Sequence, residues 1–491
     1  MHDRAFNEEF PGEGERDQGT RGPWRAEMRD GYVDEREAPR EQRGASPSRA
    51  DSAGRATAKE KKQRRALKPL IGSVAALSLL AAAWAAMGRP GLHGVVSAAD
   101  SSKPSTTAPP PPKTLTQTAA ATFTIPGRAP NIAWPLQGQA AVVVGGIGSV
   151  GTSGHVATPV PIASVTKTMV AYIILSDHPL SAGASGPSIT VTAAEAAAYP
   201  SEKAQNQSLV FVKSGEQLTE RQALEALLLA SADNVAKILA RWDAGSIDAF
   251  VTKMNTAAAS LGMTHTTYTD PSGLAASTVS TAVDQTALGT AAMQNAAFAR
   301  IVGETSATIP VQGTVANYNK LIGQDGITGI KTGSTGSAGG CLLFAATFTV
   351  GGKEQTLVGA VLGQYLGPGS GFLDPTLTVA HRLIKSVESA VVPATVAAPG
   401  TQVGAIRQAG SPDVPLGVPA PVSVIGWAGL TYQVSVSGGP SAATLTVTAT
   451  GSSSPVATSP LIPIAASSGA ASSGAATSGA GSSGAASSGT G

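Results

Sequence analysis

Apolar periodicity is confined to one long segment, roughly residues 123–393, and this limits what the 491-residue chain can fold into. Strand-like and helix-like patterns alternate within that segment. QAAVVVGGIG, GGCLLFAATFTV and KEQTLVGAVLG are typical of buried strands, whereas TERQALEALLLASADNVAKILARW and LDPTLTVAHRLIKSVESAVV have apolar residues at helical spacing. This order predicts an α+β (mixed α/β) domain in which helices pack on an antiparallel sheet.

The segments before this domain differ sharply in composition. Residues 1–68 carry about 16 Lys/Arg and about 14 Asp/Glu with few aliphatics, which predicts a disordered tail. The near balance of charge favours a solvated tail over an arm that binds nucleic acid. Residues 69–88 begin with PLIGSVAALSLLAAAWAAM, an uncharged run of about the length that crosses a bilayer.

The basic cluster KEKKQRRALK precedes this apolar run, so the positive-inside rule places the N-terminus in the cytoplasm. We therefore expect a single-pass signal anchor in the cell membrane and an extracytoplasmic location for the domain that follows it. A cleaved signal peptide is the alternative.

The remaining segments have their own signatures. Residues 89–122 contain a proline run and are expected to be a Pro/Ser/Thr linker. Short alternating runs between glycines and prolines in residues 394–450 predict a small all-β domain. Residues 451–491 are Gly/Ser/Ala repeats, typical of a disordered tail. The single cysteine, Cys341, lies in an apolar strand pattern and is interpreted as a small buried hydrophobe.

One S-x-x-K pattern, Ser164 and Lys167 in PIASVTKTMVAY, raises the question of catalysis. Residues three apart share one face of a helix, so the serine hydroxyl and the lysine amine can meet. A lysine whose pKa is lowered by its surroundings can take the proton of a serine and make it a nucleophile. Taken alone, the pattern favours a serine that opens a helix over a catalytic pair.

Two further motifs add the groups that such a pair needs. SADN interrupts the helical pattern and offers Ser231 as a second hydroxyl, while KTGSTG precedes a glycine-rich strand. In the latter, Lys331 supplies charge, Thr332 a hydroxyl and Gly333 room for close approach. A second Lys-x-Gly, KSG at 213–215, leads into a helix instead and is set aside.

The ordered motifs S-x-x-K, S-x-N-like and K-T-G, with DPSGL between the second and third, resemble those of the serine D-alanyl-D-alanine carboxypeptidases, the low-molecular-mass penicillin-binding proteins. The resemblance covers roughly residues 130–393. It implies a penicillin-binding/β-lactamase-like transpeptidase fold without metal or organic cofactor. It also implies that Ser164 is acylated, that Lys167 is its general base and that Ser231 passes the proton to the leaving D-alanine.

The same resemblance assigns the substrate-binding residues. Lys331 and Thr332 would hold the terminal carboxylate, and the backbone N–H groups of Ser164 and Ser334 would form the oxyanion hole, with Gly333 between. The implied partners are the D-Ala-D-Ala end of the peptidoglycan stem peptide, β-lactam antibiotics as covalent inhibitors, and a membrane through the N-terminal helix; no nucleic acid is implied.

The chain departs from the family pattern at one place. Asp233 stands where the motif has asparagine, and Asn234 follows it. Either Asn234 takes the role through a local shift, or Asp233 serves, or activity is lowered. An ionised Asp233 accepts hydrogen bonds but donates none, and it would raise the pKa of Lys167.

Two rival functions use the same fold. A serine β-lactamase shares the motifs, but the stretch between Val235 and Asp270 lacks the glutamate that its best-known type uses for deacylation. A wall-binding scaffold without turnover is the other. DPSGL, residues 270–274, is interpreted as a structural turn.

Overall fold

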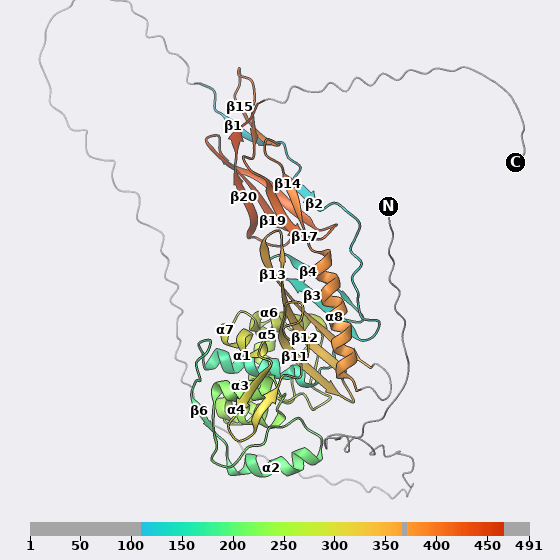
Figure 1. Cartoon of the computed structure of the whole chain (residues 1–491). Coiled ribbons are helices and arrows are strands. Elements are labelled where there is room, and N and C mark those ends of the chain that lie inside the picture. The colour runs from blue at the N-terminus through green and yellow to red at the C-terminus, as the bar shows by residue number, and fades with distance from the viewer. Residues whose placement is uncertain (1–109, 366–370, 466–491) are drawn as a thin grey trace, which may run out of the picture. The chain divides into compact units, whose positions relative to one another are not determined.

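A computed structural model describes residues 110–365 and 371–465 of the chain (Figure 1). The predicted disordered tail 1–68, the predicted membrane span 69–88 and the repeats after 465 lie outside the described residues. Among the helices that the structure does describe, none is long and apolar enough to span a bilayer.

A five-stranded antiparallel sheet in the order β11-β12-β13-β3-β4 forms the centre of the first domain. Its strands are β3 (Gln139–Val144), β4 (Gly148–Ser153), β11 (Ile327–Thr335), β12 (Gly339–Val350) and β13 (Lys353–Gln364). The three apolar runs expected to be strands are therefore β3, β12 and β13. The strand β11, which carries the KTG motif, lies at one edge of the sheet.

Both faces of this sheet are covered by helices, so its strands are apolar on both sides. Along β12, Cys341 and Leu343 point into the core that faces α6, whereas Leu342 and Phe344 point into the core under α8. Cys341 is fully buried, and burial raises the pKa of its thiol to about 12. The expected role of Cys341 as a small buried hydrophobe is thus confirmed.

The helices of the first domain are, in chain order, η1 (Ala163–Thr166), α1 (Lys167–Asp177), α2 (Ala193–Ala204), α3 (Glu220–Leu228), α4 (Asp233–Ala244), α5 (Ile247–Ser260), α6 (Ala282–Ala292), α7 (Ala296–Val302) and α8 (Leu373–Ala390). Thr219 caps α3 in a reciprocal capping box with Gln222. The long helical pattern is divided, because the chain leaves the helix between α3 and α4 at SADN. Short strand pairs complete the domain: β5 (Val160–Pro161) with β8 (Val279–Ser280), β6 (Ser188–Thr190) with β7 (Gln217–Thr219), and β9 (Ser306–Ile309) with β10 (Gly313–Ala316).

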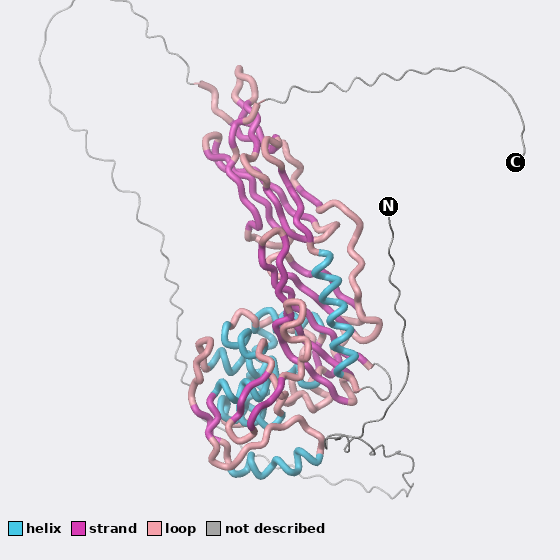
Figure 2. Tube along the Cα trace, viewed as in Figure 1, coloured by secondary structure: helices cyan, strands magenta, loops and turns pink. Residues whose placement is uncertain are grey.

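The part of the described chain after α8 consists of strands alone (Figure 2). These are β14 (Val392–Ala397), β15 (Gln402–Arg407), β16 (Val414–Gly417), β17 (Val422–Gly426), β18 (Thr431–Gly439), β19 (Ala442–Ala449), β20 (Pro455–Pro460) and β21 (Ile462–Pro463). The fold class expected from the sequence, an α+β domain followed by a small all-β domain, is confirmed.

The borders of the β domain differ from those expected. Two strands from the presumed linker 89–122 and its end, β1 (Thr114–Gln117) and β2 (Thr122–Thr124), pair with β15 and β18 and so belong to this domain. At the other end, β20 and β21 extend it beyond residue 450 into the presumed tail. The strands TLTQ and TFT are short and polar, so they lack the apolar pattern that predicts a strand. Their partner strands lie about 300 residues away in the sequence, so no local signal indicates the pairing either.

Candidate active site

Ser164 lies on the 3-10 turn η1, and Lys167 is the first residue of α1. Side chains at i and i+3 eclipse one another on a 3-10 turn, which brings Ser164 Oγ to 2.8 Å from Lys167 Nζ. Neither η1 nor α1 has a side-chain N-cap hydrogen bond, so Ser164 does not act as a helix cap.

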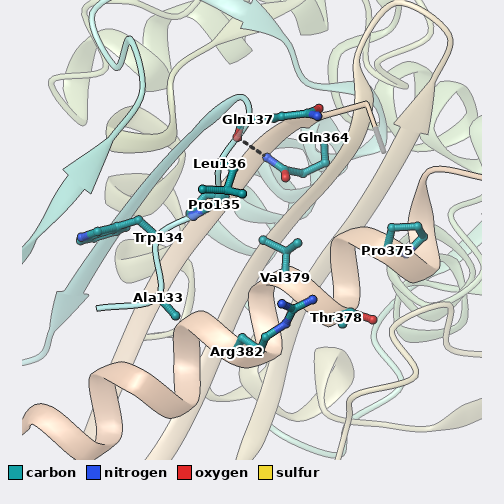
Figure 3. A pocket seen from close by; sticks show the side chains of 10 residues that line it. All are labelled: Ala133, Trp134, Pro135, Leu136, Gln137, Gln364, Pro375, Thr378, Val379 and Arg382. Atoms are coloured by element: carbon teal, nitrogen blue, oxygen red, sulfur yellow. Dashed lines mark hydrogen bonds between the residues drawn. The ribbon is translucent and has the colours of Figure 1, made fainter. Parts of the chain in front are cut away.

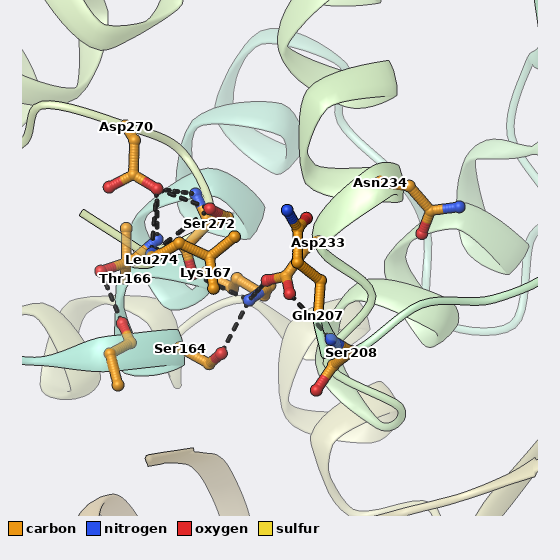
Figure 4. Close-up of polar contacts among 12 residues, drawn as sticks. Ser164, Thr166, Lys167, Gln207, Ser208, Asp233, Asn234, Asp270, Ser272 and Leu274 are labelled. Atoms are coloured by element: carbon orange, nitrogen blue, oxygen red, sulfur yellow. Dashed lines mark hydrogen bonds and ion pairs between the residues drawn. The ribbon is translucent and has the colours of Figure 1, made fainter. Parts of the chain in front are cut away.

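Lys167 is fully buried and its amine has three oxygen neighbours (Figure 4). Nζ lies 2.6 Å from Asp233 Oδ1, 2.8 Å from Ser164 Oγ and 2.8 Å from the backbone carbonyl oxygen of Ser272. The second oxygen of Asp233, Oδ2, accepts a hydrogen bond of 3.0 Å from the backbone N–H of Ser208. The amine therefore has a fixed position between the nucleophile candidate and two acceptors.

Burial lowers the pKa of Lys167, and this effect exceeds the opposing pull of Asp233, which raises it. Asp233 does favour the charged amine, as expected, but burial has the larger effect, so the pKa of Lys167 lies below its ordinary value. Lys331 is also buried, and desolvation together with the positive charge of Lys167 moves its pKa well below the usual range. Burial and the charge of a second amine both favour the neutral form of a lysine, and the neutral form is the one that can act as a base.

The SADN segment brings two of its residues to this site and turns a third away. Ser231 adopts a left-handed backbone conformation (φ 61°) in the short link between the end of α3 and Asp233, the first residue of α4. The side chain of Asn234, the residue after Asp233, points away from Lys167. Its amide donates to the backbone carbonyl of Val210 and accepts from the N–H of the same residue. The structure therefore does not bring the predicted substrate-binding residue Asn234 to Lys167; Asp233 occupies the position beside that amine.

The KTG motif lies on the edge strand β11 and passes directly over η1. Lys331 is 1% exposed and donates from Nζ to the carbonyl of Thr332 at 3.0 Å. A Cβ on Gly333 would lie 2.9 Å from the backbone nitrogen of Ser164, closer than real contacts allow. Glycine at this position thus lets β11 approach Ser164 closely, as the sequence indicates.

A cavity of about 230 Å³ opens between these motifs. Its walls include Ser164, Ser231 and the Thr332–Ser334 segment, so five of the residues predicted to touch substrate line one space. Three other lining residues, Ser208, Tyr318 and Leu373, were not found from sequence. Each comes from a loop or a helix end whose path no local pattern determines.

The DPSGL loop also reaches the site, which its interpretation as a simple turn did not include. The carbonyl of Ser272 is one of the three neighbours of Lys167 Nζ. Gly273 has φ +82°, and a Cβ there would lie 1.9 Å from the carbonyl oxygen of Ala163, the residue before the nucleophile.

A larger cavity of about 440 Å³ lies between α8 and the 133–137 segment (Figure 3). Pro135, Leu136 and Val379 give it an apolar wall, and Gln364 donates to the carbonyl of Gln137 across it at 2.7 Å. Its lining contains no serine or cysteine beside a basic group, so the smaller cavity is the one equipped for acyl transfer.

Comparisons with known proteins place the first domain in a family. The profile of the D-alanyl-D-alanine carboxypeptidases matches residues 130–364. The chain is 30% identical over 298 residues to a D-alanyl-D-alanine endopeptidase of Pseudomonas aeruginosa, covering 58% of this chain and 90% of that protein. It is 42% identical over 136 residues to the D-alanyl-D-alanine carboxypeptidase DacB2 of Mycobacterium tuberculosis. That match covers 26% of this chain and 46% of the DacB2 chain. Among solved structures, the DD-transpeptidase of Streptomyces K15 is similar at 27% identity, with a TM-score of 0.44 over 54% of this chain and 98% of that chain.

The fold and the site thus define a serine hydrolase with a lysine beside its nucleophile candidate. The chain belongs to the D-alanyl-D-alanine carboxypeptidase family. The family and enzyme class predicted from the three motifs, a serine-type D-Ala-D-Ala carboxypeptidase, are confirmed.

Proposed function

We propose that this chain is a membrane-anchored carboxypeptidase that removes the terminal D-alanine from peptidoglycan stem peptides through an acyl-enzyme on Ser164. The observation that carries the proposal is the contact of Ser164 Oγ with the buried amine of Lys167 at the mouth of a cavity walled by the KTG strand. The membrane anchor rests on the apolar run 69–88 in the sequence.

Acylation follows from these positions. The neutral amine of Lys167 takes the hydroxyl proton of Ser164, and Oγ attacks the carbonyl carbon of the penultimate D-alanine. The backbone N–H groups of Ser164 and Ser334 stabilise the resulting oxyanion. As the peptide bond breaks, the proton taken up by Lys167 passes by way of the Ser231 hydroxyl to the leaving amine of D-alanine, while Lys331 and Thr332 hold its carboxylate. Water then hydrolyses the ester and restores Ser164.

The decisive experiment uses the full chain and a fluorescent penicillin. A working nucleophile is labelled covalently, and Ser164→Ala is not labelled; release of D-alanine from a D-Ala-D-Ala peptide then demonstrates carboxypeptidase turnover. A full chain that never forms the adduct would be a scaffold without turnover, and rapid release of hydrolysed penicillin would identify a β-lactamase.

A second activity, cleavage of cross-linked peptides, is favoured by one comparison. One relative, matched over 298 residues and 90% of its own chain, is named a D-alanyl-D-alanine endopeptidase. Digestion of purified cross-linked muropeptides by the wild-type chain and by Ser164→Ala tests it: a fall in dimers that requires Ser164 supports the activity.

A further inference from the structure

The 270–274 loop touches the site in two places although it contributes no side chain to the reaction. Ser272 presents its backbone carbonyl to Lys167 Nζ, and Gly273 packs against the carbonyl of Ala163. Both contacts fall on the residues that flank or activate the nucleophile. The loop's own side chains must therefore determine where these backbone atoms lie.

Asp270 is the residue that fixes the loop. Its Oδ2 accepts hydrogen bonds from the backbone N–H groups of Ser272, Gly273 and Leu274 at 3.2, 2.8 and 3.1 Å, and from Ser272 Oγ at 2.5 Å. Its Oδ1 accepts from Thr278 Oγ1 at 2.6 Å. A carboxylate with five donors holds the loop in one conformation. Figure 4 shows the bonds from the 272–274 segment converging on one oxygen of Asp270.

The carbonyl of Ser272 has a specific effect on a neutral lysine. A neutral amine has two N–H bonds and one lone pair, and Lys167 Nζ has three oxygen neighbours. The carbonyl of Ser272 and the carboxylate of Asp233 can only accept hydrogen bonds, so they take the two N–H bonds. The lone pair is then left facing Ser164 Oγ, the one neighbour that carries a proton to give.

Gly273 packs against Ala163, the residue that precedes Ser164. Ala163 has φ +47°, a left-handed conformation that costs a residue with a Cβ about 1–2 kcal/mol. The carbonyl of Ala163 accepts a hydrogen bond from Thr166 Oγ1 at 2.8 Å and packs against Gly273, which has no Cβ to block it. The loop thus holds the strained turn on which Ser164 lies.

We propose that Asp270 is a positioning residue which, by fixing the Ser272 carbonyl, aims the lone pair of Lys167 at Ser164. The proposal rests on the proposed roles of Ser164 as nucleophile and Lys167 as base. The proton transfer it serves breaks the O–H bond of Ser164 and forms a third N–H bond on Lys167, whose ammonium then donates to all three oxygen neighbours.

Four charged groups act on Lys167 and must be considered in any pH test. Asp233 and Asp270 raise the pKa of its amine, whereas Lys237 lowers it, and Lys331 is a further buried cation coupled to it. Replacing Asp270 with Asn removes one of the two charges that favour the ammonium. The pKa of Lys167 then falls, and the acidic limb of the acylation rate moves to lower pH.

The experiment measures acylation of the full chain by a fluorescent penicillin between pH 5 and 9. In Asp270→Asn we expect the plateau rate to fall at least about tenfold and the acidic limb to move to lower pH. Thr278→Val keeps the charge of Asp270 but removes the hydroxyl that donates to Asp270 Oδ1 and accepts from the backbone N–H groups of Thr269 and Asp270. In this variant we expect a lower plateau with an unmoved limb. Ser277→Ala is the matched control, because it removes the 2.7 Å bond to Thr269 in the same loop without touching Asp270.

The outcomes separate this inference from the proposed function. If the wild-type chain is not labelled, or Ser164→Ala is, the roles of Ser164 and Lys167 fail. If those two behave as expected but Asp270→Asn keeps the wild-type plateau or leaves the acidic limb unmoved, the positioning role is wrong. Should Asp270→Asn fail to fold, Thr278→Val decides: a wild-type plateau, or a loss no greater than in Ser277→Ala, overturns the proposal.

Discussion

The ion pair between Lys167 and Asp233 is the residue-scale feature on which the pH dependence of the site depends. Both side chains are at most 2% exposed and their charged atoms are 2.6 Å apart. A buried carboxylate this close favours the ammonium form, which cannot accept a proton, while burial favours the neutral form. Here burial is the larger effect, and the pKa of Lys167 lies below its ordinary value.

Asp233→Asn should therefore lower the pKa of Lys167 further. The base must be neutral to act, so the acidic limb of the acylation rate should move to lower pH, and a rate measured on that limb should rise about three- to tenfold. The readout is the pH profile of penicillin acylation. Asp233→Ala, which also removes the acceptor of the Ser208 N–H, is the comparison; wild-type profiles in both variants would show that Asp233 does not tune the base.

A second buried carboxylate, Glu220, gives a prediction for stability. Its side chain is 1% exposed, its Oε1 has no hydrogen-bond partner among the described residues, and burial raises its pKa to about 7. The ordinary value of 4.5 applies in the unfolded chain, so the folded state binds the proton more tightly. Stability is thus intact at pH 4.5 and is lost as the pH rises through about 7.

Glu220→Gln should remove this loss. We expect the free energy of unfolding to rise by about 1–3 kcal/mol at pH 8 relative to wild type, and to change little at pH 4.5. Urea unfolding at the two pH values measures it. Glu354→Gln, at an exposed position, should change the free energy of unfolding by the same small amount at both pH values. An equal effect of Glu220→Gln at pH 8 and pH 4.5 would contradict the raised pKa of Glu220.

At the scale of elements, the close approach of the 270–274 loop to η1 depends on Gly273. The chain offers a matched control in Gly215, the glycine of the KSG decoy, which has φ +80° but nothing within 4 Å of an added Cβ. Both Ala variants carry the cost of a left-handed backbone, about 1 kcal/mol. Only Gly273→Ala also collides with the carbonyl of Ala163.

Gly273→Ala should consequently reduce the penicillin acylation rate about 100-fold or more, since η1 must shift and Ser164 with it. Gly215→Ala should acylate at the wild-type rate and lose only about 1 kcal/mol of stability. Stopped-flow acylation and urea unfolding of the two variants give the comparison. Equal acylation rates would mean that the loop moves freely without disturbing the nucleophile.

The elements also show which parts of the site could be predicted from sequence. Ser164, Lys167, Ser231 and the KTG strand could be predicted to lie together because their motifs consist of side chains at fixed spacings, and the structure brings them to one place. The carbonyl of Ser272 was not, because a backbone oxygen has no residue signature and its position depends on the Asp270 network. The direction of Asn234 was missed because a one-residue step at the start of α4 turns a side chain to another face.

At the scale of the whole molecule, the all-β domain is assembled from both sides of the catalytic segment in the sequence. The strands β1 and β2 precede that segment and pair with β15 and β18, which follow it. Ile125, just after β2, is 2% exposed in the core of the β domain. A catalytic fragment that begins near residue 130 would therefore leave strands β15 and β18 without these partners.

Ile125→Ala tests this arrangement without deleting any strand. Removing a fully buried isoleucine side chain should cost the β domain about 2–4 kcal/mol, because the cavity is only partly refilled. The penicillin acylation rate should stay at the wild-type value, since Ile125 packs in a core separate from those of the catalytic domain. Thermal unfolding followed by calorimetry gives the first quantity and stopped-flow fluorescence the second. Thr122→Ala, at an exposed position of β2, should change neither. An unchanged unfolding profile for Ile125→Ala would mean that the N-terminal strands do not contribute to the stability of the β domain.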